Sequence, residues 1–144
     1  MYIYKSSIVK KDTMNTKLDK ILAEISAGEL IDKITILEIK KIKIADKDKI
    51  NEINKEFLSL KITQEKFIPD LSKISQLKED LKDINLKLWE IENQKRNSEK
   101  NNEFGKEFIE LARNVYKYND ERAKIKLKIN NILGSNIKEV KSHF

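Results

Sequence analysis

The sequence predicts an all-α protein whose centre is a long antiparallel helical hairpin, spanning about 71–97 and 104–133. Only three Gly and one Pro occur among 144 residues, which leaves too few turn signals for an all-β fold. In both stretches apolar residues recur at alternating spacings of three and four, the heptad seam of coiled-coil packing. The polar link 97–102 joins two seams of similar length, so we expect antiparallel neighbours. The seam residues are Ile74, Leu77, Leu81, Ile84, Leu88 and Ile91, then Phe104, Phe108, Leu111, Val115, Tyr118, Arg122, Ile125, Ile129 and Ile132.

A helix at about 27–44 is predicted before the hairpin. Ser26 and Glu29 have the spacing of a capping box, in which the Ser hydroxyl accepts from the Glu amide and the Glu carboxylate returns to the Ser amide. The apolar residues of this helix cover an arc too wide for one neighbour, so it must pack on two sides. Residues 1–20 show no sustained period. We expect a loose arm there, followed by one helical domain at 21–144.

A second N-terminal helix is predicted at about 48–65. Asp46 or Asp48 can cap its first turn. Pro69 and Asp70 then suit the first turn of the hairpin. The hairpin is therefore expected to pack against one or two N-terminal helices. The apolar face of the second helix contains Ile50, Ile53, Phe57, Leu58 and Leu60.

Charge limits the classes of function. The net charge is +6, but 27 of the 30 basic residues are Lys interspersed with Asp and Glu, a pattern typical of solvated helix surfaces. This argues against nucleic acid as a partner. Residues 117–144 nevertheless carry seven basic residues against three acidic ones, which keeps a basic binding surface as an alternative. Arg96, Arg113 and Arg122 are the only arginines and mark positions where a planar, forked donor is needed.

The residue inventory excludes several kinds of site. No Cys occurs, which removes thiolate chemistry and fits a cytoplasmic protein. No apolar run approaches roughly 20 residues, so we expect no membrane segment. The only His is His143, in the C-terminal tail, so no di-metal bundle or other metal site is predicted. The sequence has no Gly-rich phosphate loop, and we expect no cofactor.

One polar residue interrupts the hairpin seam. Arg122 lies where the period requires an aliphatic side chain, and a guanidinium without an acceptor is very costly to bury. If the hairpin folds about residue 100, Arg122 comes within reach of Asp80 or Asn85. The structural alternative is that only its stem packs while its head reaches solvent beside Asp80 or Glu79.

A second stripe beside the seam adds further polar residues. On the first hairpin helix it contains Asn85, Trp89, Glu92 and Arg96, which share one side of the helix. On the second helix it contains Ala112, Tyr116, Asn119 and Ala123. The small Ala residues would let the first N-terminal helix approach closely. We predict either a hydrogen-bonded network that fixes helix register or a small polar pocket around Trp89 and Tyr116, formed by Glu38, Asn85, Glu92, Asn119 and Arg122.

Four segments resemble an uncharacterised bacterial family of small helical proteins. They are SAGELIDKITILEIK at 26–40, NLKLWEIENQKR at 85–96, FIELARNVYKYNDERAKIKLKIN at 108–130 and GSNIKEVKS at 134–142. The resemblance brings no established activity. Some members of that family are fused to or encoded near glycosyltransferase-type proteins, which implies a link to cell-envelope sugar metabolism. After Ile-Glu, where the family often has an acidic residue, this chain has Asn93. The residues that the resemblance implies to be special are Glu29, Asp32, Lys33, Glu38, Trp89, Glu92, Arg113, Asn119, Asp120 and Arg122.

These observations predict a non-catalytic helical interaction or accessory protein that forms a homodimer or binds another protein. The main alternative is an enzyme or binder for a small anionic ligand, held in an inter-helix pocket around Trp89 and Arg122. Asn85 and Tyr116 join the residues above as candidate ligand contacts. In this alternative the anion is held by Lys33, Arg113 or Arg122, and a proton is handled by Glu38 or Glu92.

Overall fold

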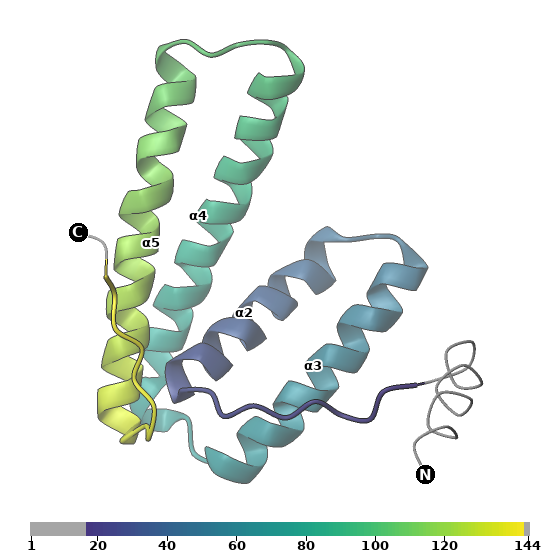
Figure 1. Ribbon diagram of the computed structural model, residues 1–144, viewed down its shortest axis with the longest axis vertical. Coiled ribbons are helices and arrows are strands. Elements are labelled where there is room, and N and C mark those ends of the chain that lie inside the picture. Colours follow the sequence, from purple (N-terminus) through teal and green to yellow (C-terminus); the bar gives the residue numbers. More distant parts are fainter. Residues whose placement is uncertain (1–16, 143–144) are drawn as a thin grey trace, which may run out of the picture.

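The computed structural model describes residues 17–142, and in that range the regular secondary structure is entirely helical. Figure 1 shows two helical hairpins of unequal length, with the shorter one lying against the lower half of the longer one. The predicted all-α hairpin architecture is therefore confirmed. Residues 17–25 form no regular element, and the rest of the predicted arm lies outside the described residues. The elements are α2 (Ala27–Lys43), α3 (Lys47–Phe67), the 3-10 turn η1 (Ser72–Ile74), α4 (Ser75–Lys100) and α5 (Lys106–Leu133).

The ends of the long hairpin differ from the prediction. Helix α4 begins at Ser75, after η1, so Pro69 and Asp70 lie in the preceding link rather than in a first helical turn. Asp70 instead accepts a hydrogen bond from the Ser72 amide at 2.9 Å, a local turn that competes with helix formation. At the other end α4 continues to Lys100, so the link to α5 is shorter than the polar stretch of the sequence suggests.

Helix α2 lies at the centre of the molecule and contacts α3, α4 and α5. Most of its apolar arc is buried, as the width of that arc predicts, but Ile42 near the C-terminal end of the helix is 74% exposed. The main core forms where Ile31 of α2 meets Ile74, Leu81 and Ile129. Each of these side chains comes from a different element, and burying each contributes roughly 1.5–3 kcal/mol. The core thus joins α2 to the base of the long hairpin.

The outer parts of the molecule are covered less completely. The hairpin seam near the α4–α5 link is only partly buried, and Phe104 is exposed, because two helices alone leave one flank of each seam open. In α3 only Ile53 and Gln64 are buried. The prediction that Leu58 faces the core is wrong, since this side chain is 62% exposed. Among the described residues, no helix is long and apolar enough to cross a membrane.

Helix α2 approaches α5 closely at a glycine. A Cβ atom added to Gly28 would lie 2.5 Å from the backbone oxygen of Lys126, and the Gly28 amide donates to Asn130 Oδ1 at 2.6 Å. The expected approach over Ala112 and Ala123 is wrong for the first of these, because Ala112 is exposed. The contact between α2 and α5 therefore depends on the absence of a side chain at Gly28, and not on Ala112.

We predict that Gly28→Ala lowers the free energy of unfolding by about 2–3 kcal/mol, because the new methyl group meets backbone that cannot move independently of α5. This loss exceeds the roughly 1 kcal/mol that Ala gains over Gly in a helix. Urea unfolding at equilibrium measures the difference. Gly105→Ala is the control, since a Cβ there meets nothing within 4 Å, and it should cost about 1 kcal/mol or less. Equal stabilities for the two variants would contradict the close approach at Gly28.

Candidate functional site

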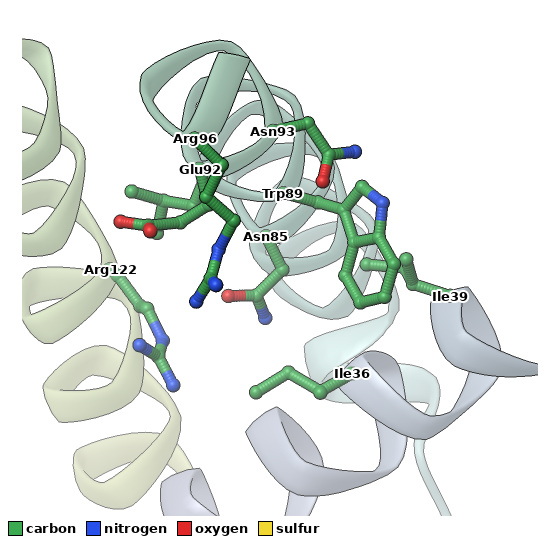
Figure 2. A pocket seen from close by; sticks show the side chains of 9 residues that line it. Ile36, Ile39, Asn85, Trp89, Glu92, Asn93, Arg96 and Arg122 are labelled. Carbon is green, nitrogen blue, oxygen red and sulfur yellow. The ribbon is translucent and has the colours of Figure 1, made fainter. Parts of the chain in front are cut away.

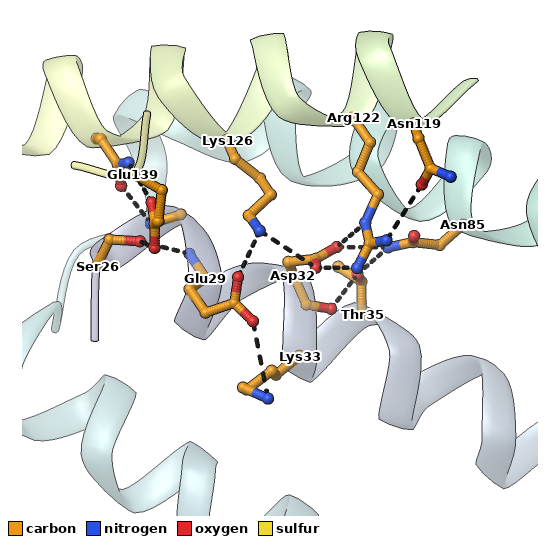
Figure 3. A network of polar contacts seen from close by, with 12 residues as sticks. Ser26, Glu29, Asp32, Lys33, Thr35, Asn85, Asn119, Arg122, Lys126 and Glu139 are labelled. Carbon is orange, nitrogen blue, oxygen red and sulfur yellow. Dashed lines mark hydrogen bonds and ion pairs between the residues drawn. The ribbon is translucent and has the colours of Figure 1, made fainter. Parts of the chain in front are cut away.

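A buried carboxylate connects three helices. Asp32, in the second turn of α2, is 0% exposed. Its Oδ1 accepts from Arg122 Nε at 3.0 Å and from Asn85 Nδ2 at 2.8 Å, and its Oδ2 accepts from Arg122 Nη2. Lys126 Nζ lies 3.8 Å from the same Oδ2. Figure 3 shows these groups reaching Asp32 from α4 and α5. A carboxylate removed from water needs such compensation, because its desolvation costs several kcal/mol.

Arg122 is fixed by this contact. Its two hydrogen bonds to Asp32 form the forked geometry that a guanidinium offers to a carboxylate, and a longer bond of 3.5 Å runs from Nη1 to Asn119 Oδ1. The hydrogen bonds with Asp32 outweigh burial and raise the pKa of Arg122 above its usual value. The prediction that Asp80 or Glu79 accepts a hydrogen bond from Arg122 is wrong. Asp80 instead accepts from Gln76 on the surface of α4.

Asn85 has a defined role in the same cluster. Its Nδ2 donates both to Asp32 and to Thr35 Oγ1, the latter at 3.0 Å. The Thr35 hydroxyl in turn donates to the backbone oxygen of Asp32 at 2.8 Å. The structure therefore brings together Asn85, Asn119 and Arg122, as the stripe analysis predicted, and adds Asp32 and Thr35 of α2 as their partners.

The first turn of α2 is held by a second group of contacts. Ser26 Oγ accepts from the Glu29 amide at 3.0 Å, which is half of the predicted capping box. The other half is wrong, because the Glu29 carboxylate binds Lys126 and, at 3.7 Å, Lys33. Ser26 Oγ also donates to Glu139 of the C-terminal tail.

The tail and the end of α5 cap the remaining amides of this turn. The Ala27 amide donates to Ser135 Oγ at 3.0 Å, and the Gly28 amide donates to Asn130 Oδ1. Burial by itself would raise the pKa of Glu139, but hydrogen bonds from Ser26, a backbone amide and Asn130 keep it below its usual value. Ser135 and Glu139 could not be predicted from the sequence, because the tail has no helical period. Asn130 lies in α5, but its partner Gly28 is too far away in the sequence to be found from the helical period.

Glu38 lies outside the Asp32 cluster. Its carboxylate pairs with Lys82 at 2.9 Å and with Lys78 at 3.2 Å, both on α4. Burial opposes its ionisation, yet the hydrogen bonds and charges of these lysines hold the pKa of Glu38 below its usual value. Tyr116 is 56% exposed, so it does not form the predicted wall. The expected convergence of Glu38 with Arg122 around Tyr116 is therefore wrong.

The remaining predicted site residues lie at the surface. Lys33 is exposed and pairs with Glu29. Asp120 pairs with Lys141 of the tail. Arg113 is exposed and forms no ion pair within residues 17–142. These positions are spread over different faces and form no common site with Arg122.

An open pocket of about 390 Å³ lies beside the Asp32 cluster, between α2, α4 and α5. In Figure 2 the guanidinium groups of Arg96 and Arg122 point toward one another across it, with the Trp89 indole on the α2 side. Glu92 also lines the pocket, although one of its oxygens pairs with Lys95 at 3.4 Å. The lining residues are Ile36, Ile39, Asn85, Leu88, Trp89, Glu92, Asn93, Arg96 and Arg122.

The pocket offers hydrogen-bond donors, positive charge and an apolar surface. Two guanidinium groups provide donors for an oxyanion, while the apolar floor and the indole can contact a carbon skeleton. Arg96 forms no ion pair with any carboxylate in the described part of the chain. In the same part, no group of three or more His, Cys, Asp or Glu residues is arranged to hold a metal ion.

Comparison with known proteins places the chain in a family. The model of a family of unknown function, DUF6165, matches residues 21–143. The chain belongs to this family. Neither the curated proteins nor the solved structures contain a significant match.

We predict that Arg122→Leu lowers the free energy of unfolding by about 3 kcal/mol, because it leaves Asp32 buried without its principal cation. The figure is at the low end for buried pairs, since the Arg122 side chain is 27% exposed and Lys126 stays nearby. In the double variant Asp32→Leu/Arg122→Leu the combined loss should be smaller than the sum of the two single losses, by about 2 kcal/mol. Chemical denaturation of all four proteins gives this coupling. Additive losses would mean that the pair is not a unit.

Proposed function

We propose that this DUF6165 protein is a helical accessory protein that binds a small anionic ligand in the pocket between α2, α4 and α5. One observation carries the proposal. The chain uses Lys for 27 of its 30 basic residues, yet two of its three arginines, Arg96 and Arg122, line the same pocket together with the only Trp. Arginine is favoured over lysine where a planar, bidentate donor must meet a carboxylate or phosphate.

The surrounding charges favour an anion. Asp32, Glu29 and Glu92 lie in or beside the pocket and pair with Arg122, Lys126 and Lys95, which leaves Arg96 as one positive charge in excess. Each of the three carboxylates already has a cation partner. A ligand with one or two negative charges would therefore meet a net positive site, where its attraction falls with added salt.

The lining supports binding without a chemical step. Glu92 is the one carboxylate among the pocket-lining residues of the described chain, and that set contains no Ser, Cys, His, Lys or Tyr. A nucleophile paired with a base therefore cannot be assembled from it. We propose an accessory role on this basis. The link to cell-envelope sugar metabolism rests on the resemblance alone and stays a prediction.

The ligand hypothesis is tested by titrating inorganic phosphate and small carboxylates such as citrate into the protein. Because Trp89 is the only Trp, intrinsic fluorescence reports on this pocket directly. We expect a saturable change with at least one of these anions, and a tenfold or greater weakening in Arg96→Ala, since a charged hydrogen bond contributes about 1.5–3 kcal/mol. Arg113→Ala removes the arginine that lies outside the pocket and should bind normally. Equal weakening by both variants would indicate a general charge effect instead.

Self-association is a second candidate function, favoured by exposed apolar side chains on α3. Leu58, Ile62 and Phe67 are each more than half exposed, and Phe67 lines an apolar cavity of about 650 Å³ together with the exposed Leu22. Leu58 and Ile62 are four residues apart and share one face of α3, and exposed apolar side chains that lie together are typical of protein interfaces. The hairpin seam is less suitable than the sequence suggests, because most of its residues are at least partly buried between α4 and α5.

We predict that the protein forms a dimer at micromolar concentration and that Ile62→Glu makes it monomeric by placing a charge in the interface. Ile109→Glu is the matched control, because Ile109 is also half exposed but lies on α5. Light scattering coupled to size-exclusion chromatography distinguishes the two states. A native protein that is monomeric at high micromolar concentration contradicts this candidate without affecting the ligand hypothesis.

The basic C-terminal half gives less support to nucleic-acid binding. Of its cations, Arg122, Lys126 and Lys141 are held in ion pairs with Asp32, Glu29 and Asp120. These charges are therefore partly neutralised before any phosphate approaches. We therefore propose no nucleic-acid partner.

A further inference from the structure

The amide of Asn85 is fixed in one orientation by its neighbours. A carboxylate can only accept hydrogen bonds, so the atom of Asn85 that contacts Asp32 Oδ1 at 2.8 Å must be the NH₂ group. The Thr35 hydroxyl gives its hydrogen to the Asp32 backbone oxygen, so it too accepts from Asn85. Two independent acceptors thus hold Nδ2 toward α2.

The consequence is that Asn85 Oδ1 points away from α2. Figure 2 shows this oxygen turned toward Arg96 and the interior of the pocket. Asn85 is only 6% exposed, and its oxygen accepts no hydrogen bond from a described residue. Every fully buried side-chain N or O among the described residues does have a partner, so Oδ1 must be reached from the pocket. The pocket therefore contains a fixed hydrogen-bond acceptor that the protein leaves unpaired.

The donors of the pocket are equally well defined. A guanidinium has five N–H bonds. Arg122 uses one on Nε and one on Nη2 for Asp32, and one on Nη1 for Asn119. One N–H on each of Nη1 and Nη2 is left to donate to the oxygens of a carboxylate or phosphate. Arg96, whose guanidinium faces Arg122 across the pocket, adds further donors.

We infer that the ligand is a small carboxylate or phosphate ester that carries a hydroxyl or amino group near its anionic end. The anion contacts Arg96 and Arg122, and the hydroxyl or amino group donates to Asn85 Oδ1. This inference rests on the proposed function, because it names the ligand class of the same pocket. A ligand without the donor group would cover the Asn85 oxygen and leave it unpaired, and loss of such a hydrogen bond changes affinity about three- to tenfold.

Matched pairs of ligands test the inference on the native protein, with Trp89 fluorescence as the readout. Glycolate is compared with acetate, and glycerol 3-phosphate with propyl phosphate. Within each pair the charge is the same and the hydroxyl differs. We expect the hydroxylated member to bind about three- to tenfold more tightly in at least one pair, and the pair that responds identifies the anion as carboxylate or phosphate. The same preference should persist in Glu92→Ala, since Asn85 is the acceptor.

Each other result overturns a defined part of the proposal. If both members of a pair bind equally, the inference about the donor group is wrong while anion binding stands. If the preference exists but is lost in Glu92→Ala, the acceptor is Glu92 and not Asn85. If neither pair binds, and neither phosphate nor citrate binds, the proposed function fails together with the inference.

Discussion

Burial of the Asp32 carboxylate is the constraint on which the packing of α2 against the long hairpin depends. A fully buried anion costs several kcal/mol unless it is paired and hydrogen-bonded, and here the compensating groups come from Asn85 on α4 and Arg122 on α5. A shift of α2 by one residue would remove this match and place Ile31 or Lys33 opposite the guanidinium. The apolar core drives the helices together, while the carboxylate selects one register among several that would bury similar area.

The same side chains connect the network to the pocket. Arg122 and Asn85 each direct some of their hydrogen-bonding atoms toward Asp32 and leave the others at the pocket surface. The Asp32 network and the pocket therefore share Asn85 and Arg122. From the sequence, a structural network and a ligand pocket are alternatives, but Arg122 takes part in the network and also lines the pocket.

The helical period predicted the fold well but not the pairing within the site. The hairpin seam and the wide apolar arc of α2 follow from local spacing, and the interruption at Arg122 identified the most important polar residue. Its acceptor could not be found in the same way, because the rotation of α2 relative to the hairpin is set by tertiary packing. At about 100° per residue, Glu38 points about 120° away from Asp32, so an error of about a third of a turn in orienting the helix selects the wrong carboxylate. The stripe of Gly28, Asp32 and Thr35 was the available signal, since small and polar residues replace aliphatic ones on a buried face.

The state of the two arginines before binding determines how a ligand would be held. Arg122 is already immobilised by Asp32 and Asn119, so a ligand loses little side-chain entropy by contacting it. Arg96 is exposed and forms no ion pair within residues 17–142, so ordering its side chain costs roughly 0.5–1.5 kcal/mol. The rigid arginine therefore defines the position of the anion, whereas the free one adds charge after the ligand has arrived. Removing Arg96 should weaken affinity while the protein stays folded, but removing Arg122 changes the fold and the site together, which makes Arg96 the informative position.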